Sequence, residues 1–221
     1  MSWWGYLDRP HTVKPTSENL DCVSYSPYRD EYTLNENKTF VTSDTIDADF
    51  AIIAERFSCV RIYTTLHGMD RAPEIAQKYG LSVIVGVWIS PDLMENMHDL
   101  DTALTVAEKY PSVTHLLIGN EALFFETISP KYLYLYLKYA KTRTTKPVST
   151  GEIVSTWNEQ RKLSELSDFI AIHVFPYWNN IPIEKSVEYL EGDYNFMETL
   201  FPDKQIIIAE TGWPSNGVSR G

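Results

Sequence analysis

Two glutamates occupy positions in this sequence from which a pair of carboxylates could act together. Glu121 follows the apolar run 113–119 and stands beside Asn120, while Glu210 ends the run 205–210. Cleavage of a glycosidic bond needs two such groups, because one protonates the departing oxygen while the other attacks or stabilises the anomeric carbon. A lone glutamate at a strand end usually caps a helix or pairs with a basic residue, so the hypothesis depends on the pair.

The elements that must position these glutamates follow a repeating pattern. Short runs rich in β-branched residues alternate with longer segments of helical period, which is typical of βα units around a parallel sheet. Seven strands are predicted, at residues 21–26, 59–64, 82–89, 113–119, 147–152, 169–175 and 205–211. The predicted fold class is α/β, a (β/α)8 TIM barrel, in which the ends of strands four and seven face each other across the mouth.

Apolar stripes and prolines locate helices between these strands. The two stripes consist of Ile46, Phe50, Ile53 and Phe57, and of Val187, Leu190, Tyr194, Met197 and Phe201. Their helical spacing predicts sides that face the core. Ser90–Pro91 and Ser129–Pro130 each resemble an N-cap followed by a first-turn proline, so helices are expected to begin at these two points.

The length of the chain suits a single catalytic barrel domain over 1–221, with residues 1–19 as an N-terminal extension. A spacing of about one strand every 30 residues predicts an eighth βα unit beyond Gly221. Seven strands alone would expose two hydrogen-bonding edges. We therefore expect a chain truncated at its C-terminus, or a missing segment or partner chain that completes the barrel.

Composition excludes some classes of partner. The 30 acidic residues outnumber the 19 basic ones, which are scattered, so the basic stripe that nucleic acids require is absent. No apolar run approaches the roughly 20 residues that span a bilayer, and the start of the chain does not resemble a signal peptide. The two cysteines, Cys22 and Cys59, fall near the starts of neighbouring predicted strands, where we favour buried free thiols over a disulfide.

Several motifs at predicted strand ends together resemble one enzyme family. They are VSYSPY at 23–28, VRIY at 60–63, GNE at 119–121, HVFPYW at 173–178 and ETGWPS at 210–215. Over essentially its whole length the chain is similar to glycoside hydrolase family 17, which belongs to clan A of these barrels. The motifs SPYR at 26–29 and GVW at 86–88 are closer to the bacterial branch of β-1,3-glucanases and β-1,3-glucanosyltransferases than to plant endoglucanases.

The resemblance implies a retaining mechanism through a covalent glycosyl-enzyme intermediate, with Glu121 as acid/base and Glu210 as nucleophile. Glu210 would be the negative neighbour that a protonated Glu121 needs. Arg61 is the expected cation beside Glu210, and its alternative role is a structural ion pair. Asn120 is expected to hydrogen-bond the sugar 2-hydroxyl, and its alternative role is to close a turn.

Other residues near strand ends are candidates for binding substrate. The aromatic ones, suited either to stacking on sugar rings or to core packing, are Tyr25, Tyr63, Trp88, Tyr177, Trp178 and Trp213. Glu152 would add a third carboxylate near the mouth, where it binds a hydroxyl or raises the proton affinity of Glu121. His173 is interpreted as an inner hydrogen-bonding residue, since no second His or Cys keeps metal-ligand spacing with it. No metal or cofactor is expected, because two carboxylates suffice.

Three alternatives remain for the activity. Transfer of sugar to another glucan, with some hydrolysis, is favoured over endo-hydrolysis on the resemblance alone. A non-catalytic glucan-binding module is the alternative of another class, because in family 17 the eighth unit carries further residues of the cleft. A phosphate-handling isomerase fits less well, since Trp213–Pro214 stands where such barrels have glycine-rich loops. The expected partner is β-1,3-glucan or its oligosaccharides, and the family indicates a periplasmic or secreted location.

Overall fold

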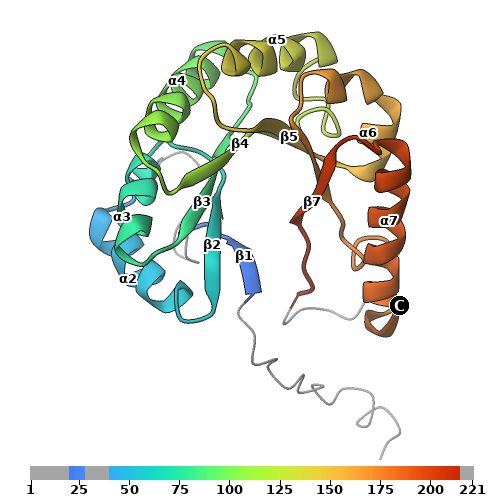
Figure 1. Ribbon diagram of the computed structural model, residues 1–221, viewed down its shortest axis with the longest axis horizontal. Coiled ribbons are helices and arrows are strands. Elements are labelled where there is room, and N and C mark those ends of the chain that lie inside the picture. The colour runs from blue at the N-terminus through green and yellow to red at the C-terminus, as the bar shows by residue number, and fades with distance from the viewer. Residues whose placement is uncertain (1–19, 28–39, 215–221) are drawn as a thin grey trace, which may run out of the picture.

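A computed structural model of the protein describes residues 20–27 and 40–214. Seven parallel strands lie side by side in chain order, each hydrogen-bonded to the next (Figure 1). They are β1 Leu20–Ser24, β2 Phe57–Ile62, β3 Ser82–Val87, β4 Val113–Asn120, β5 Val148–Ile153, β6 Phe169–His173 and β7 Gln205–Glu210. All seven predicted strands are confirmed, with ends that differ from the prediction by at most two residues.

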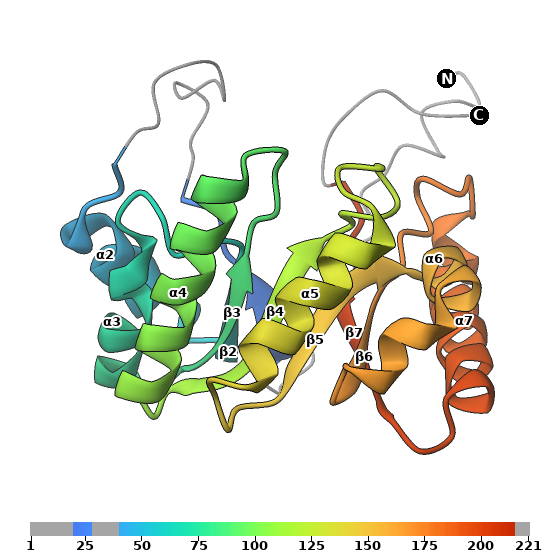
Figure 2. The ribbon, with the colours of Figure 1, turned by 90° about the horizontal axis from the view of Figure 1, so that it is seen from above.

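Helices follow the strands and cover the outer side of the curved sheet (Figures 1 and 2). The α-helices are α2 Ser43–Ile53, α3 Ala72–Lys78, α4 Leu93–Lys109, α5 Pro130–Lys141, α6 Val154–Glu159 and α7 Ser186–Leu200. Short 3-10 helices occur at η1 Met69–Arg71, η2 Arg161–Glu165 and η3 Ile183–Lys185. The large core fills the space between strands and helices. A small separate core fills the interior of the ring; its buried members are Cys59, Ile84, Leu117, Phe169 and Ala171.

The predicted helix starts are confirmed at one of two places. Helix α5 begins at Pro130, as expected. Helix α4 begins at Leu93 instead of Pro91, because the Asp92 side chain accepts hydrogen bonds from the first-turn N–H groups. Ser90 does not cap this helix, since its hydroxyl accepts a hydrogen bond of 3.1 Å from the Asp92 N–H in a turn just before it.

Each apolar stripe lies on a helix except for its last residue, Phe57 or Phe201, which follows the helix. Ile46 and Phe50 are buried on α2, and Met197 is buried on α7. Helix α2 ends at Ile53, so Phe57 belongs to β2. Val187 is 65% exposed in the first turn of α7, so the buried side of this helix begins later than predicted.

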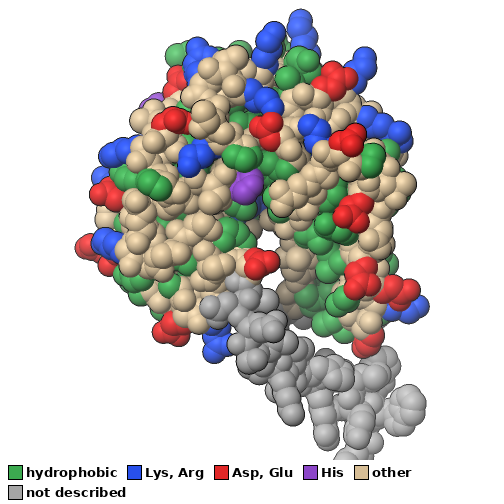
Figure 3. Space-filling view, viewed as in Figure 1, with side chains coloured by type: hydrophobic (Ala, Val, Ile, Leu, Met, Phe, Trp, Pro, Cys, Tyr) green, Lys and Arg blue, Asp and Glu red, His purple; other side chains and the backbone are tan. Residues whose placement is uncertain are grey.

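The ring of strands is open between β1 and β7 in the part of the chain that the structure describes. The space-filling view is hollowed between these two sides (Figure 3). On the same face acidic and basic side chains intermingle, and no stripe of one sign is visible. The predicted fold class is confirmed as a TIM barrel, of which the described residues contain all but the eighth unit.

Two expectations concern the ends of the domain and its relation to a membrane. The proposed N-terminal extension at 1–19 lies outside the described residues, and the extent of the domain over 1–221 stays a prediction. None of the helices described combines the length and the apolar character needed to cross a membrane.

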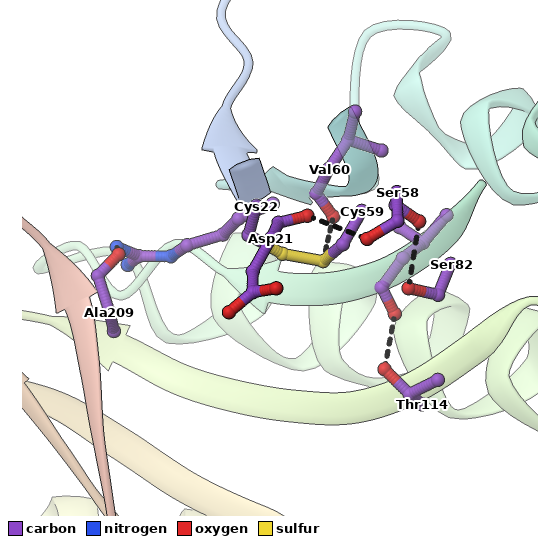
Figure 4. The surroundings of a disulfide bond; sticks show 10 residues. Asp21, Cys22, Ser58, Cys59, Val60, Ser82, Thr114 and Ala209 are labelled. Carbon is purple, nitrogen blue, oxygen red and sulfur yellow. Dashed lines mark hydrogen bonds between the residues drawn. A yellow bond between two sulfur atoms is a disulfide. The ribbon is translucent and has the colours of Figure 1, made fainter. Parts of the chain in front are cut away.

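A disulfide joins Cys22 to Cys59, which corrects the expectation of two free thiols (Figure 4). The two residues are direct partners in the β1–β2 ladder. The sequence located both cysteines near strand starts but did not fix the register between the strands, and this register brings the two side chains together. The Ser58 hydroxyl also donates to the Asp21 carbonyl at 3.1 Å, so β1 is tied to β2 by more than its ladder (Figure 4).

We predict that the disulfide stabilises the native state, since it closes a loop with a sequence separation of 37 residues. Replacing both cysteines (Cys22→Ala with Cys59→Ala) should lower the free energy of unfolding by about 2–4 kcal/mol, because the unfolded chain regains its freedom. Urea unfolding followed by circular dichroism measures this change. Reductant should shift the midpoint of the unmodified protein and leave the double variant unaffected; equal shifts in both would contradict the prediction.

Candidate active site

The backbone turns sharply at the end of β4, just where Glu121 leaves the strand. Gly119 has φ of 90° and Glu121 has φ of 52°, a left-handed conformation that is uncommon outside glycine. The pairing of β4 with β5 is irregular between Leu117 and Asn120, and the Glu121 N–H donates to the Gly151 carbonyl at 2.8 Å. A strained backbone conformation of this kind persists only where neighbouring contacts fix it, and it is common at functional sites.

Arg61 links three strands at the mouth of the barrel. Its Nη1 donates to Glu210 Oε1 at 2.7 Å and to the Ala209 carbonyl at 3.1 Å, both on β7. Its Nη2 donates to Asn120 Oδ1 on β4 at 2.6 Å. The side chain is almost fully buried, so its ion pair with Glu210 is poorly screened by water. The structure thus brings Arg61, Asn120 and Glu210 together, as the sequence suggested.

His173 connects Glu121 to the same cluster from β6. Its Nδ1 lies 2.9 Å from Glu121 Oε1, and its Nε2 lies 3.4 Å from Arg61 Nη1. A guanidinium can only donate, so Nε2 accepts and the ring proton stays on Nδ1, where it is donated to Glu121. A Cβ atom on Gly151 would lie 2.6 Å from His173 Nε2, so this glycine is what lets the ring lie here. His173 is therefore an inner hydrogen-bonding residue, as predicted.

The two catalytic candidates face each other closely. One carboxylate oxygen of Glu121, one of Glu210 and one ring nitrogen of His173 all lie within 4.8 Å of one another. Among the described residues this is the one group of three or more His, Cys, Asp or Glu side chains close enough to hold a metal ion. Arg61 already supplies a positive charge to Glu210, which disfavours a cation at the same place.

Glu152 lies deeper than the sequence suggested. Its side chain is fully buried, and its carboxylate accepts hydrogen bonds from the N–H groups of Leu123 at 2.9 Å and Phe124 at 3.3 Å. Burial raises the pKa of Glu152 to about 7, and the two backbone hydrogen bonds oppose the rise. Its depth argues against the contact with a substrate hydroxyl, because both carboxylate oxygens are bound by the loop after β4, and the alternative effect on the proton affinity of Glu121 stays a prediction.

The aromatic candidates divide by exposure. Trp88 and Trp178 expose 48% and 59% of their surface, and Trp213 is also exposed. Tyr25 is buried, and its hydroxyl donates to Asp49 at 2.8 Å, which favours the core-packing alternative.

The other two tyrosines contact neighbouring side chains at the mouth. The Tyr63 ring lies under Arg61, with the guanidinium carbon 4.8 Å from the ring centroid. Tyr177 makes edge contacts with both Trp178 and Trp213.

Two cavities lie beside the carboxylate pair. One of about 560 Å³ is lined by Tyr25, Tyr63 and Trp88 on the β1–β3 side. The other, of about 720 Å³, is lined by Glu121, His173 and Trp178 on the β4–β6 side. Aromatic walls with a few polar groups are typical of sites that bind small ligands.

The larger cavity contains aromatic residues that sequence reasoning missed. They are Phe124, Phe125, Phe175, Tyr189 and Phe196. Phe124 and Phe125 are about half or more exposed and contact each other edge to face. A signal for Phe124 and Phe125 was present, since these two consecutive phenylalanines begin three residues after Glu121, in a loop that follows a strand end.

This fold and this site together define a TIM barrel of the glycoside hydrolase type, with carboxylates at the ends of its fourth and seventh strands. Comparison with known families agrees. The chain belongs to the family described as the BtgE/BtgC glycoside hydrolase domain, which matches residues 22–221.

Two curated relatives from Aspergillus species match most of this chain. The probable beta-glucosidase btgE of Aspergillus fumigatus is 25% identical over 207 residues, which cover 90% of this chain and 36% of that protein. The probable glucan endo-1,3-beta-glucosidase btgC of Aspergillus terreus is 26% identical over 218 residues, covering 88% of this chain and 32% of that protein. The chain thus spans about a third of the length of the curated relatives it matches.

Solved structures share the fold. A glycoside hydrolase family 17 beta-1,3-glucanosyltransferase from Rhizomucor miehei superposes with a TM-score of 0.75 at 21% identity, covering 88% of this chain and 71% of that one. An active-site mutant of the same enzyme was solved with laminaritriose. A beta-D-glucuronidase from Dictyoglomus thermophilum has a TM-score of 0.57 at 18% identity, over 76% and 32% of the two chains. The predicted barrel of the glycoside hydrolase type is confirmed.

We predict that Glu152 makes the stability of the protein depend on pH. Its pKa is raised in the folded state from 4.5 to about 7, so the folded protein binds this proton more tightly than the unfolded chain does. The free energy of unfolding should therefore fall as pH rises through this window, by on the order of 3 kcal/mol from this group.

The matched variant is Glu152→Gln, which keeps the shape and cannot ionise. Urea unfolding of both proteins at pH 5, 6, 7 and 8 measures the difference. The unmodified protein should lose stability relative to the Gln variant as pH rises. Parallel curves over this range would show that the carboxyl does not titrate there.

Proposed function

We propose that this chain is the catalytic barrel of a retaining glycosidase that acts on β-1,3-glucan, mainly as a glucanosyltransferase with some hydrolysis. The observation that supports this most strongly is the pair Glu121 and Glu210, whose nearest ligand atoms lie within 4.8 Å. Retaining enzymes hold their two carboxyl groups about 5–5.5 Å apart, whereas inverting enzymes need about 6.5–9.5 Å to admit a water between them.

The partners of each glutamate support a division of roles. Arg61 stabilises the charged form of Glu210 and has no hydrogen bond to Glu121 among the described residues. Glu210 is therefore suited to attack the anomeric carbon, forming an ester bond as the glycosidic C–O bond breaks. Glu121 donates its proton to the departing oxygen in this step.

In the second step the direction of proton transfer reverses. Glu121, now a carboxylate, takes the proton from an incoming hydroxyl, which attacks the anomeric carbon and displaces Glu210. His173 donates its Nδ1 proton to Glu121 Oε1, so it orients this carboxyl throughout. No group beyond these is needed to balance atoms and charge.

Asn120 is oriented for a contact with substrate. Its Oδ1 is occupied by Arg61 at 2.6 Å, which fixes the amide so that its NH2 group remains as a donor. A donor beside the nucleophile is suited to the 2-hydroxyl of the sugar, a contact that strengthens in the transition state.

The nature of the substrate is supported by similarity and by the cavity walls. One curated relative is named a glucan endo-1,3-beta-glucosidase, and the structural neighbour from R. miehei is a beta-1,3-glucanosyltransferase. The exposed indoles of Trp88 and Trp178 provide flat apolar faces on either side of the carboxylate pair. Such faces stack on the apolar sides of sugar rings.

Transfer is favoured over hydrolysis because of the cavity that Glu121 lines. The acid/base faces both the leaving group and the acceptor, and its cavity of about 720 Å³ is walled by Phe124, Phe125 and Trp178. A sugar acceptor gains from burying these rings, whereas water does not. The relatives named above are fungal, so a bacterial-type enzyme stays a prediction.

Two alternatives are kept. Endo-hydrolysis of β-1,3-glucan uses the same first step and differs only in the acceptor. A non-catalytic glucan-binding module remains the alternative of another class, because strand β7 has no second neighbour in the described part of the chain and the cleft is open on that side. A further segment or a partner chain that completes the barrel also stays a prediction.

The test incubates the protein with end-labelled laminari-oligosaccharides and follows products by mass spectrometry. Products longer than the input are expected, with shorter ones as a minority. Glu121→Gln and Glu210→Gln should each lower the rate at least about a thousandfold, since each removes a group that acts in both chemical steps. Binding without any product would instead favour the module.

The stereochemistry needs its own readout. Proton NMR during the first turnovers identifies the anomer released when water is the acceptor. A β-anomer as the first product from the β-linked substrate is expected for retention, and an α-anomer would contradict the proposed intermediate. The matched variant Arg61→Lys keeps the charge but not the paired contacts to Glu210 and Asn120, so it should lower the rate while retaining β product.

A further inference from the structure

A buried carboxylate on α4 makes four contacts that the proposed chemistry does not use. Asp99 is fully buried. Its Oδ1 accepts from the Thr65 N–H at 2.8 Å and from the Thr65 hydroxyl at 2.5 Å. Its Oδ2 accepts from the Thr64 hydroxyl at 2.7 Å and from the Trp88 N–H at 2.9 Å. Both oxygens are thus fully used by other elements.

These contacts join two neighbouring strand ends. Thr64 and Thr65 follow β2 and come directly after Tyr63, whereas Trp88 is the first residue after β3. Tyr63 and Trp88 line the same cavity of about 560 Å³. The one carboxylate of Asp99 therefore fixes the backbone on both sides of this cavity.

A second buried side chain, one turn earlier on α4, holds the same loop further along. Asn96 is fully buried. It accepts from the Ser90 N–H at 2.8 Å and donates to the Ser90 carbonyl, also at 2.8 Å. The segment from Trp88 to Ser90 is thus bound at both ends by α4, because residues three apart on a helix lie on one side.

We propose that Asp99, supported by Asn96, is a positioning residue that sets the place of Trp88 and so the affinity for long glucan chains in the cavity on the β1–β3 side. This inference rests on the proposed function and adds the residue that controls binding at one end of the site. Helix α4 contributes no side chain to the carboxylate pair, so Asp99 acts only through the strand ends it holds.

The physical reason for a carboxylate lies in the number and kind of its partners. All four groups that reach its two oxygens are donors. An asparagine in the same place would turn an NH2 group toward two of those donors, and hydrogen bonds to charged groups are stronger than neutral ones. The Trp88 N–H would then lose a strong acceptor, while the packing around position 99 stays the same because asparagine and aspartate are of nearly equal size.

The experiment uses Asp99→Asn in a Glu121→Gln background, so that binding is measured without turnover. Calorimetry with laminarihexaose should show a dissociation constant about tenfold higher than that of the Glu121→Gln parent. Hydrogen exchange at residues 88–90 should become faster. In a Trp88→Ala background the same Asp99→Asn change should have almost no further effect on binding, since the two residues act through one contact.

Ser167→Ala is the matched control. The Ser167 hydroxyl is also buried and donates to Leu163 at 2.9 Å, but it lies before β6, at the opposite end of the barrel from the site. Ser167→Ala should lower thermal stability about as much as Asp99→Asn does, but it should leave the dissociation constant for laminarihexaose unchanged. If Ser167→Ala weakens binding as much as Asp99→Asn, the effect is one of general stability and the inference is wrong.

Further outcomes separate this inference from the proposed function. Additive effects of Asp99→Asn and Trp88→Ala, or unchanged exchange at 88–90, would overturn the inference and leave the proposed function standing. If the Glu121→Gln protein binds laminarihexaose but the unmodified protein never cleaves it, the proposed catalysis is wrong and the inference about Asp99 stands. A parent that does not bind hexaose overturns both, because the inference concerns glucan.

Discussion

A positive charge inside a barrel must be satisfied by its surroundings, and Arg61 meets this condition with three partners on two other strands. Its buried guanidinium contacts Glu210 and Ala209 on β7 and Asn120 on β4. Only its Nε lacks a partner among the described residues. Removing one partner of a buried pair leaves an uncompensated charge, which is far more costly than the pair itself. The ends of β2, β4 and β7 are therefore held at one spacing, and that spacing brings the two glutamates together.

Buried carboxylates outside this cluster hold the aromatic walls. Asp99 binds the strand ends beside Trp88, and Glu152 binds the N–H groups of the loop that carries Phe124 and Phe125. Both are fully buried, and burial raises the pKa of each. Each lies on a different side of the carboxylate pair. Acidic groups thus lie in two kinds of place, as a pair at the centre of the mouth and singly beneath the aromatic walls.

Features that depend on local sequence pattern were predicted from the sequence. Features that depend on strand register or on the burial of a side chain were not. All seven strands were predicted because their apolar runs are continuous, and the strand-end placement of Glu121 and Glu210 was predicted because both stand at the ends of such runs. The Cys22–Cys59 bond was missed, since pairing across strands has no local signal. Glu152 was placed too near the surface, because a strand end in sequence does not tell which loop folds over it. Asp99 was not singled out, because an isolated aspartate within a helix carries no motif that distinguishes it from a solvent-facing one.

The exposed aromatic rings suit the open site to the sugar chain proposed as its substrate. Trp88, Phe125 and Trp178 each leave about half or more of their surface in water, although burying such rings is favourable. Rings that the fold itself does not bury are available to another flat apolar surface. Their positions on both sides of two fixed carboxylates mean that a chain of sugars, bound along both cavities, would cover them and place one bond at the centre. The same substrate contact that buries these rings would therefore also select the bond to be cleaved.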